Sequence, residues 1–185
     1  MASLCVPFQV VVPTYDEVPI PGTPEEVVQE RALGKARSVA GRGIVIGVDT
    51  EVVVDGGGVL GQPATGAAAR EMLLALAGRE HRVLSGLAVL GRCEQLAVAE
   101  TVVRLRDLTD AEVDAYVARG EWRGRAGGYA IQETGAALIA EVRGDYANVV
   151  GLPVSLLADL LKAEGMSLVL AGDNPLGAVG NPERA

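Results

Sequence analysis

Aromatic residues are scarce in this sequence. They make up 3% of its 185 residues, whereas the hydrophobic fraction is 49%. A core must therefore be built from valine, leucine, isoleucine and alanine. The length suits one domain, or one domain with two lobes.

Cysteine and histidine are almost absent as well. The two cysteines, Cys5 and Cys93, give no disulfide framework and no metal-binding spacing. We therefore expect reduced thiols that are buried or have no functional role. His81 is the single histidine, and any Ser-His or Cys-His catalytic pair would have to use it. No nucleophile lies near it in the sequence. We therefore interpret His81 as structural.

Long apolar runs and an excess of positive charge are also lacking. No run reaches the roughly 18 residues that a membrane span needs, and no charged-then-apolar leader opens the chain, which predicts a cytoplasmic protein without a membrane partner. The 24 acidic and 16 basic side chains give a net charge of −8. Such a surface repels polyphosphate chains, so we expect no nucleic-acid partner. The net charge does not exclude binding of a small anionic ligand, because a few basic groups and a divalent cation can reverse the potential inside one cleft.

The pattern of apolar residues predicts a mixed α/β domain. Apolar, mostly β-branched runs predict strands over 8–12, 44–54, 82–90, 95–105, 136–142 and, at one edge, 167–170. Helices are expected over 24–40, 65–76, 110–119 and 153–164. Two of them begin with capping boxes, Thr23 with Glu26 and Thr109 with Glu112. The tail 172–185 has no periodicity, and we expect it to be flexible.

Asp49 is the most unusual residue, because it comes directly after the apolar run 44–48. A carboxylate at the end of a buried strand is costly unless a cation meets it. Strand alternation places Glu51 on the same face, so the pair could hold a magnesium ion, or one carboxylate could activate a water. Equally, Asp49 could cap a turn or pair with an arginine.

A basic, glycine-rich segment, Arg123 to Tyr129, is the second candidate site. Glycines allow backbone N–H groups to approach a phosphate, and the arginines supply charge. A solvated turn is the competing interpretation.

Together these segments resemble the Maf family of nucleoside triphosphate pyrophosphatases. The resemblance runs from about Val6 to Leu161 and is carried by the order and spacing of four stretches. These are Tyr15-Asp16-Glu17; 46–53 (IGVDTEVV) with Asp55-Gly56 and 60–63 (LGQP); 125–132 (RAGGYAIQ); and 144–153 (GDYANVVGLP).

The resemblance implies an elongated mixed sheet flanked by helices, with a central cleft, as in the inosine triphosphate pyrophosphatases. It implies cleavage of the α–β phosphoanhydride of a nucleoside triphosphate to monophosphate and pyrophosphate, with a divalent metal such as Mg²⁺ or Mn²⁺. Asp49 matches the family's proton acceptor, and Glu17 and Lys35 match cleft residues associated with metal and phosphate. Asp49 and Glu17 are thus the expected metal ligands. Thr50 and Gln132 match positions linked to base specificity and look like the dTTP/UTP branch. Arg125, in the third stretch, is expected to bind substrate, and a homodimer is left open.

Two departures from the family pattern qualify this expectation. The family begins with a strand and a Ser-Pro-Arg-Arg turn that opens a helix and faces the phosphates. Residues 1–8 resemble only the end of that helix and the loop after it, so 1–171 is expected to be a single domain lacking this segment. Gln62 replaces a family lysine among the substrate-binding residues. Three alternatives stay open: an active pyrophosphatase, a degenerate relative that binds nucleotides or a protein without efficient turnover, or an enzyme of the same fold acting on another phosphorylated molecule.

Overall fold

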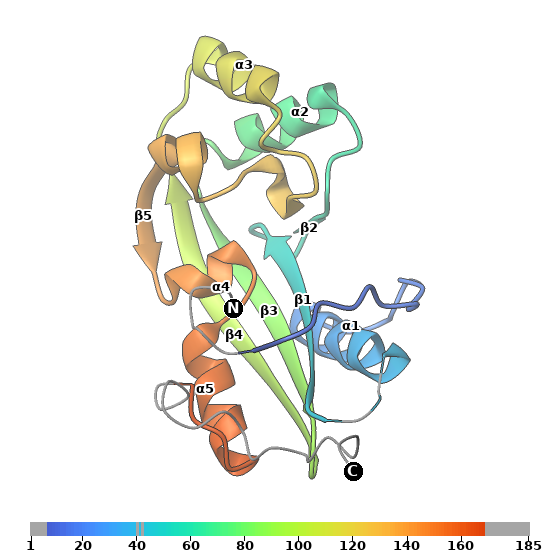
Figure 1. Ribbon diagram of the computed structural model, residues 1–185. Helices are drawn as coiled ribbons and strands as arrows, with labels where there is room; N and C mark the ends of the chain where they lie inside the picture. The colour runs from blue at the N-terminus through green and yellow to red at the C-terminus, as the bar shows by residue number, and fades with distance from the viewer. Residues whose placement is uncertain (1–6, 40, 42, 169–185) are drawn as a thin grey trace, which may run out of the picture.

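A long antiparallel hairpin forms the centre of the molecule (Figure 1). In the computed structural model, which describes residues 7–39, 41 and 43–168, it consists of β3 (Glu80–Leu90) and β4 (Glu94–Leu105). The five-stranded sheet has the order β2-β1-β3-β4-β5, and each of its pairings is antiparallel. Its other strands are β1 (Val45–Val53), β2 (Val59–Leu60) and β5 (Ile139–Arg143). The predicted pairing of 82–90 with 95–105 is confirmed.

Helices cover the sheet on both faces and at one end (Figure 1). The helix α1 (Pro24–Ser38) packs against β1 and β3, while α5 (Val154–Ala163) packs on the opposite face through Leu157 and Leu161. A second core lies at the other end, under α2 (Gly66–Leu76) and α3 (Asp110–Arg119). The short helix α4 (Tyr146–Val150) and the 3₁₀ helices η2 (Ala126–Gly128) and η3 (Glu133–Leu138) complete the fold. The expected α/β class, a sheet flanked by helices, is confirmed.

Local sequence explains where α1 begins and how closely it lies on the sheet. Thr23 and Glu26 form the predicted capping box, which satisfies backbone N–H groups at the start of the helix. Gly47 of β1 and Gly86 of β3 face the helix, and a Cβ at either position would overlap a backbone carbonyl of α1, that of Ala32 or Val28. The two glycines therefore bring α1 into direct contact with the sheet.

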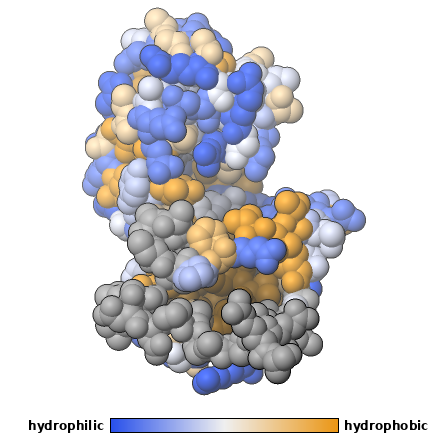
Figure 2. Space-filling view, in the orientation of Figure 1, coloured by the Kyte–Doolittle hydropathy of each residue, from blue (hydrophilic) through white to orange (hydrophobic). Residues whose placement is uncertain are grey.

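Some predicted elements differ from the structure. Segment 8–12 is not a strand, and its side chains are mostly exposed, with Val10 and Val12 at 80% and 83%. Figure 2 shows strongly apolar surface on this side of the molecule. The prediction was wrong because β-branched composition gives only propensity, and no neighbouring strand pairs with this segment in the described chain. The strand expected over 136–142 begins at Ile139, because Glu133–Leu138 form η3.

The remaining predictions concern the two ends of the chain and the start of one helix. Ser167 and Leu168 are not in a strand, and the rest of the expected strand 167–170 lies outside the described residues, as do Cys5 and the tail 172–185. The helix expected over 65–76 begins at Gly66 with Thr65 as its N-cap. The sequence did not indicate β2 or α4.

Candidate functional site

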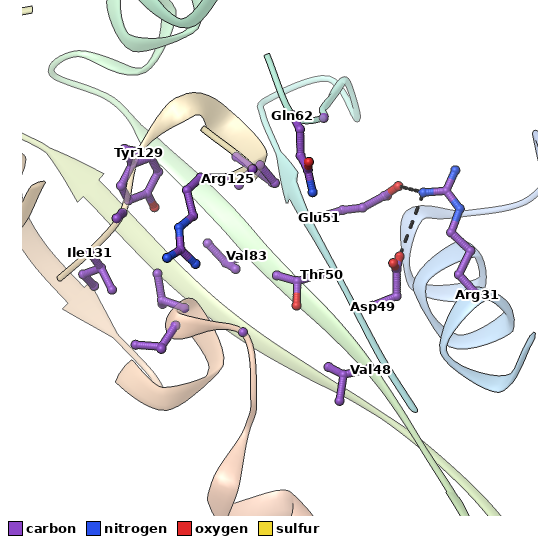
Figure 3. Close-up of a pocket in the computed structure, with 18 of the residues that line it drawn as sticks. Arg31, Val48, Asp49, Thr50, Glu51, Gln62, Val83, Arg125, Tyr129 and Ile131 are labelled. Carbon is purple, nitrogen blue, oxygen red and sulfur yellow. Dashed lines mark hydrogen bonds and ion pairs between the residues drawn. The ribbon is translucent and has the colours of Figure 1, made fainter. Parts of the chain in front are cut away.

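A cleft of about 560 Å³ lies between the two ends of the molecule. One wall is β1 with α1, and the other is the glycine-rich segment 124–132 together with residues 149–151 (Figure 3). Between Val45 and Glu51, one edge of β1 pairs with no strand in the described chain, because β2 reaches only Val52 and Val53. The cleft therefore reaches side chains on both faces of β1. All seven residues predicted to act in the site line it: Glu17, Lys35, Asp49, Thr50, Gln62, Arg125 and Gln132.

Charged side chains gather where α1 crosses β1. The Lys35 ammonium donates a hydrogen bond to Asp49 Oδ1 at 2.5 Å and lies 2.6 Å from Glu17 Oε1. The Arg31 guanidinium forms a short ion pair with Glu51 and lies 3.9 Å from Asp49 Oδ2 (Figure 3). Asp49 and Glu51 thus share one face of the strand, as alternation predicted, and both are more than nine-tenths buried. The sequence left open whether Asp49 serves a site or pairs with a basic residue. In the structure it pairs with Lys35 and Arg31, and it also lines the cleft.

The pKa values of these groups depend on burial and pairing. Burial alone would lower the pKa of Lys35, but its hydrogen bonds to Asp49 and Glu17 raise it above the ordinary value. The hydrogen bond from Lys35 lowers the pKa of Glu17. Burial raises the pKa of Glu51 by more than the neighbouring Arg31 lowers it. Lys35 is therefore cationic at neutral pH, between two carboxylates.

Thr50 lies on the opposite face of β1 from the charged cluster. Its hydroxyl is 2.8 Å from that of Ser85, which is fully buried on β3. Val48 and Val52 flank Thr50 on this face and also line the cleft. This part of the cleft has the mixture of apolar surface and few polar groups that suits a planar ring.

Two interpretations of the glycine-rich wall were open, a phosphate cradle and a solvated turn. The Gly127 N–H donates to the Gly61 carbonyl and the Gly128 N–H to that of Arg125, so both amides have partners within the fold. This arrangement does not support the alternative in which these two amides approach a phosphate. Arg125 projects into the cleft (Figure 3), whereas Arg123 stacks on Trp122 outside it.

Sequence reasoning missed Arg31 as a cleft residue, whereas Tyr129 belongs to the glycine-rich candidate segment, and both line the cleft. Arg31 lies one helical turn before Lys35, and two basic residues at that spacing share a helix face, a signal that could have identified it. Tyr129 is buried with its hydroxyl 2.7 Å from His81 Nε2, and the two rings meet edge to face. His81 is 2% exposed, and burial lowers its pKa to about 4. These features agree with the structural interpretation of His81.

The arrangement offers a protected carboxylate, fixed cations and a flat apolar subsite in one cleft. Within residues 7–39, 41 and 43–168, no three His, Cys, Asp or Glu side chains are placed so that they could hold a metal together. Asp49 Oδ2 is buried and accepts no hydrogen bond from any described residue, although the Arg31 guanidinium lies 3.9 Å from it. In the same ranges no helix has the length and apolar character to cross a membrane.

Comparisons with known proteins agree with this chemistry. Residues 1–164 match the family model described as "Maf-like protein". The chain is 46% identical over 172 residues to a protein of Symbiobacterium thermophilum, which covers 90% of this chain and 88% of the relative. It is 41% identical over 164 residues to one from Clostridioides difficile, covering 85% and 84%. A relative from Halalkalibacterium halodurans is 44% identical over 172 residues, or 90% of each chain. All three are named dTTP/UTP pyrophosphatase.

Proposed function

This chain belongs to the Maf-like protein family, and on that premise we propose that its cleft hydrolyses dTTP and UTP to the monophosphate and pyrophosphate. The reaction consumes one water and breaks the α–β phosphoanhydride. The observation that carries the proposal is the buried Asp49 carboxylate, held by Lys35 in a cleft large enough for a nucleotide. Because nucleoside triphosphates are cytoplasmic metabolites, we propose that the protein acts in the cytoplasm.

Asp49 is proposed to accept the proton of the attacking water. Lys35 donates a hydrogen bond to Oδ1, whereas Oδ2 accepts no hydrogen bond within the described chain and lies 3.9 Å from Arg31, so Oδ2 is the oxygen proposed to accept the proton. Arg125 on the opposite wall is proposed to contact the phosphates, because it lines the cleft and forms no ion pair within the described chain. Thr50 and Gln132 are proposed to contact the base.

The donor set also fits a divalent cation such as Mg²⁺ or Mn²⁺. Magnesium is commonly held by one or two carboxylates together with substrate phosphates, so a larger protein cluster is not required. The carboxylates of Asp49 and the half-exposed Glu17, which Lys35 brings together, would hold it. When bound, the cation would neutralise charge on the phosphate oxygens.

The substrate prediction is tested by a screen of purified protein against the common nucleoside triphosphates. Pyrophosphate is expected chiefly from dTTP and UTP, with the corresponding monophosphate as the second product. Chromatography of the products separates this reaction from release of a single phosphate. Preferential turnover of guanine nucleotides would contradict the assignment of the base subsite.

Gln62 allows a second test, because it lines the cleft and its side chain is neutral. Replacing it with lysine adds a cation for the phosphates, and one charge-assisted hydrogen bond contributes roughly 1.5–3 kcal/mol. We therefore expect Gln62→Lys to lower KM or raise kcat by about 10-fold or more. Unchanged or weaker kinetics would indicate that the cleft has adapted to glutamine, or that Glu51 captures the new ammonium.

Nucleotide binding without efficient turnover is the second candidate function. One observation favours it: Arg31 and Lys35 are already paired with carboxylates, which reduces the positive charge offered to a triphosphate. Binding of UTP with no release of pyrophosphate, measured with and without Mg²⁺, would support this candidate over the first.

A further inference from the structure

The segment that carries Gln132 forms a loop whose ends touch. Residues 130–135 fold back so closely that a Cβ on Gly135 would overlap the carbonyl oxygen of Ala130. Gln132 lies midway along this loop and lines the cleft. The position of its amide therefore depends on how the ends of the loop are held.

Two side chains from the region of α3 hold the ends. At the entry, the Ala130 N–H donates to the Tyr116 hydroxyl at 2.9 Å. At the exit, the carboxylate of Glu121 accepts a short hydrogen bond from the Thr134 hydroxyl and a second one, at 3.2 Å, from the Gly135 N–H. Glu121 comes directly after Gly120, the C-cap of α3, and does not line the cleft. It contacts the loop without occupying the substrate space.

The backbone between Gln132 and this anchor is strained. Glu133 has φ of 54°, and it is the one non-glycine residue with positive φ among those the structure describes. L-residues with a side chain rarely adopt this conformation, and they keep it only where their surroundings enforce it. The next two residues, Thr134 and Gly135, donate the hydrogen bonds to Glu121 that supply this restraint.

We propose that Glu121 is a positioning residue for base selection, which fixes the turn at Glu133 and thereby holds Gln132 at the base subsite. The inference rests on the proposed function. Uracil presents a carbonyl and an N–H where cytosine presents an amino group and an unprotonated nitrogen. A glutamine amide carries both donors and an acceptor, so it distinguishes the two bases only when it is held in place.

The test compares UTP with CTP in four variants of the full chain: Glu121→Ala, Glu121→Gln, Gln132→Ala and the double variant Glu121→Ala/Gln132→Ala. Glu121→Ala is expected to lower the ratio of the two kcat/KM values by about 10-fold, the effect of one well-placed hydrogen bond. The lower kcat/KM for UTP should arise mainly from a higher KM. The ratio for Glu121→Gln should lie between those of the unmodified protein and Glu121→Ala, because the glutamine carbonyl oxygen can still accept a hydrogen bond from Thr134.

Three controls separate positioning from general damage. Asp114→Asn removes an exposed carboxylate of α3 that pairs with Arg70, and it should leave the ratio unchanged. In the Gln132→Ala background, Glu121→Ala should have no further effect on the ratio. Hydrogen exchange of the amides over 130–135 should accelerate in Glu121→Ala and not in Asp114→Asn.

An unchanged ratio in Glu121→Ala, or additive effects in the double variant, would overturn the proposal. A general loss of stability would lower the rates for both nucleotides equally, and that result would also overturn it. Should the unmodified protein release pyrophosphate from no triphosphate, the proposed function fails. The exchange rates and the ratio of UMP to CMP affinity would still decide the role of Glu121.

Discussion

Replacing Asp49 by asparagine is expected to lower kcat by about 10²–10⁴-fold, the range typical of removing a general base. Asparagine has nearly the shape of aspartate but no charge and no useful basicity. The fold is expected to survive, because Lys35 keeps Glu17 at 2.6 Å and the asparagine oxygen can still accept from Lys35. The loss should therefore appear in turnover and not in the amount of folded protein.

Rate, thermal melting and nucleotide binding should be measured together, with Asp55→Asn as the matched control. Asp55 lies just beyond the same strand in an exposed turn, so its replacement removes the same charge outside the cleft. A folded Asp49→Asn protein with near-native turnover would show that Asp49 is not the base, and Glu17 and Glu51 would be tested next. If the unmodified chain has no turnover, the same variant should be examined for altered metal or nucleotide binding.

Lowering the pH from 7 to 4 is expected to reduce the free energy of unfolding by about 3 kcal/mol through His81 alone, because a pKa that differs between the folded and unfolded states makes stability depend on pH. Burial lowers the pKa of His81 from 6.5 to about 4. Below pH 6.5 the unfolded chain binds a proton that the folded chain excludes, so this contribution is present at neutral pH and is lost as the pH falls toward 4. Below pH 4 both states are protonated, and no further loss occurs.

Urea unfolding at pH 7 and pH 4 measures this effect when the protein is compared with His81→Gln. Glutamine does not titrate, and its amide can still hydrogen-bond to Tyr129. The carboxylates contribute equally in both proteins, so the difference between the two pH profiles isolates His81. Tyr129→Phe keeps the histidine and removes its partner, which separates titration from loss of the hydrogen bond. Parallel pH profiles for the unmodified protein and His81→Gln would show that His81 does not titrate in this range.

Elements specified by neighbouring residues were predicted well from the sequence. The capping boxes at Thr23 and Thr109 were located correctly because each is complete within four residues. The β3–β4 hairpin was identified because its two apolar runs are close in the chain. Segment 8–12 failed because a strand requires a partner as well as propensity, and the pattern of valines does not identify one.

Contacts between distant parts of the chain were beyond such reasoning. The position of Asp49 suggested a cationic partner, but nothing local identified Lys35, 14 residues earlier, over Arg125 on the far wall. His81 meets Tyr129 across 48 residues, and Glu133 adopts positive φ without the glycine that would signal it. These features arise from packing. The assignment of roles therefore relied on family resemblance, whereas the structure adds that all seven assigned residues share one cleft.

The β3–β4 hairpin also has a mechanical consequence. Its strands are 11 and 12 residues long, so at the usual rise per residue they extend for roughly 40 Å. The core beneath α2 and α3 and the core beneath α5 are attached to this same pair of strands (Figure 1). The cleft lies between these two parts of the molecule. A protein whose halves are joined by loops can open by swivelling about a few free torsions. Here the two halves share an unbroken hydrogen-bonded ladder, so the cleft widens only if β3 and β4 bend together. Such bending is elastic, and the cleft returns to its original width when the force is removed.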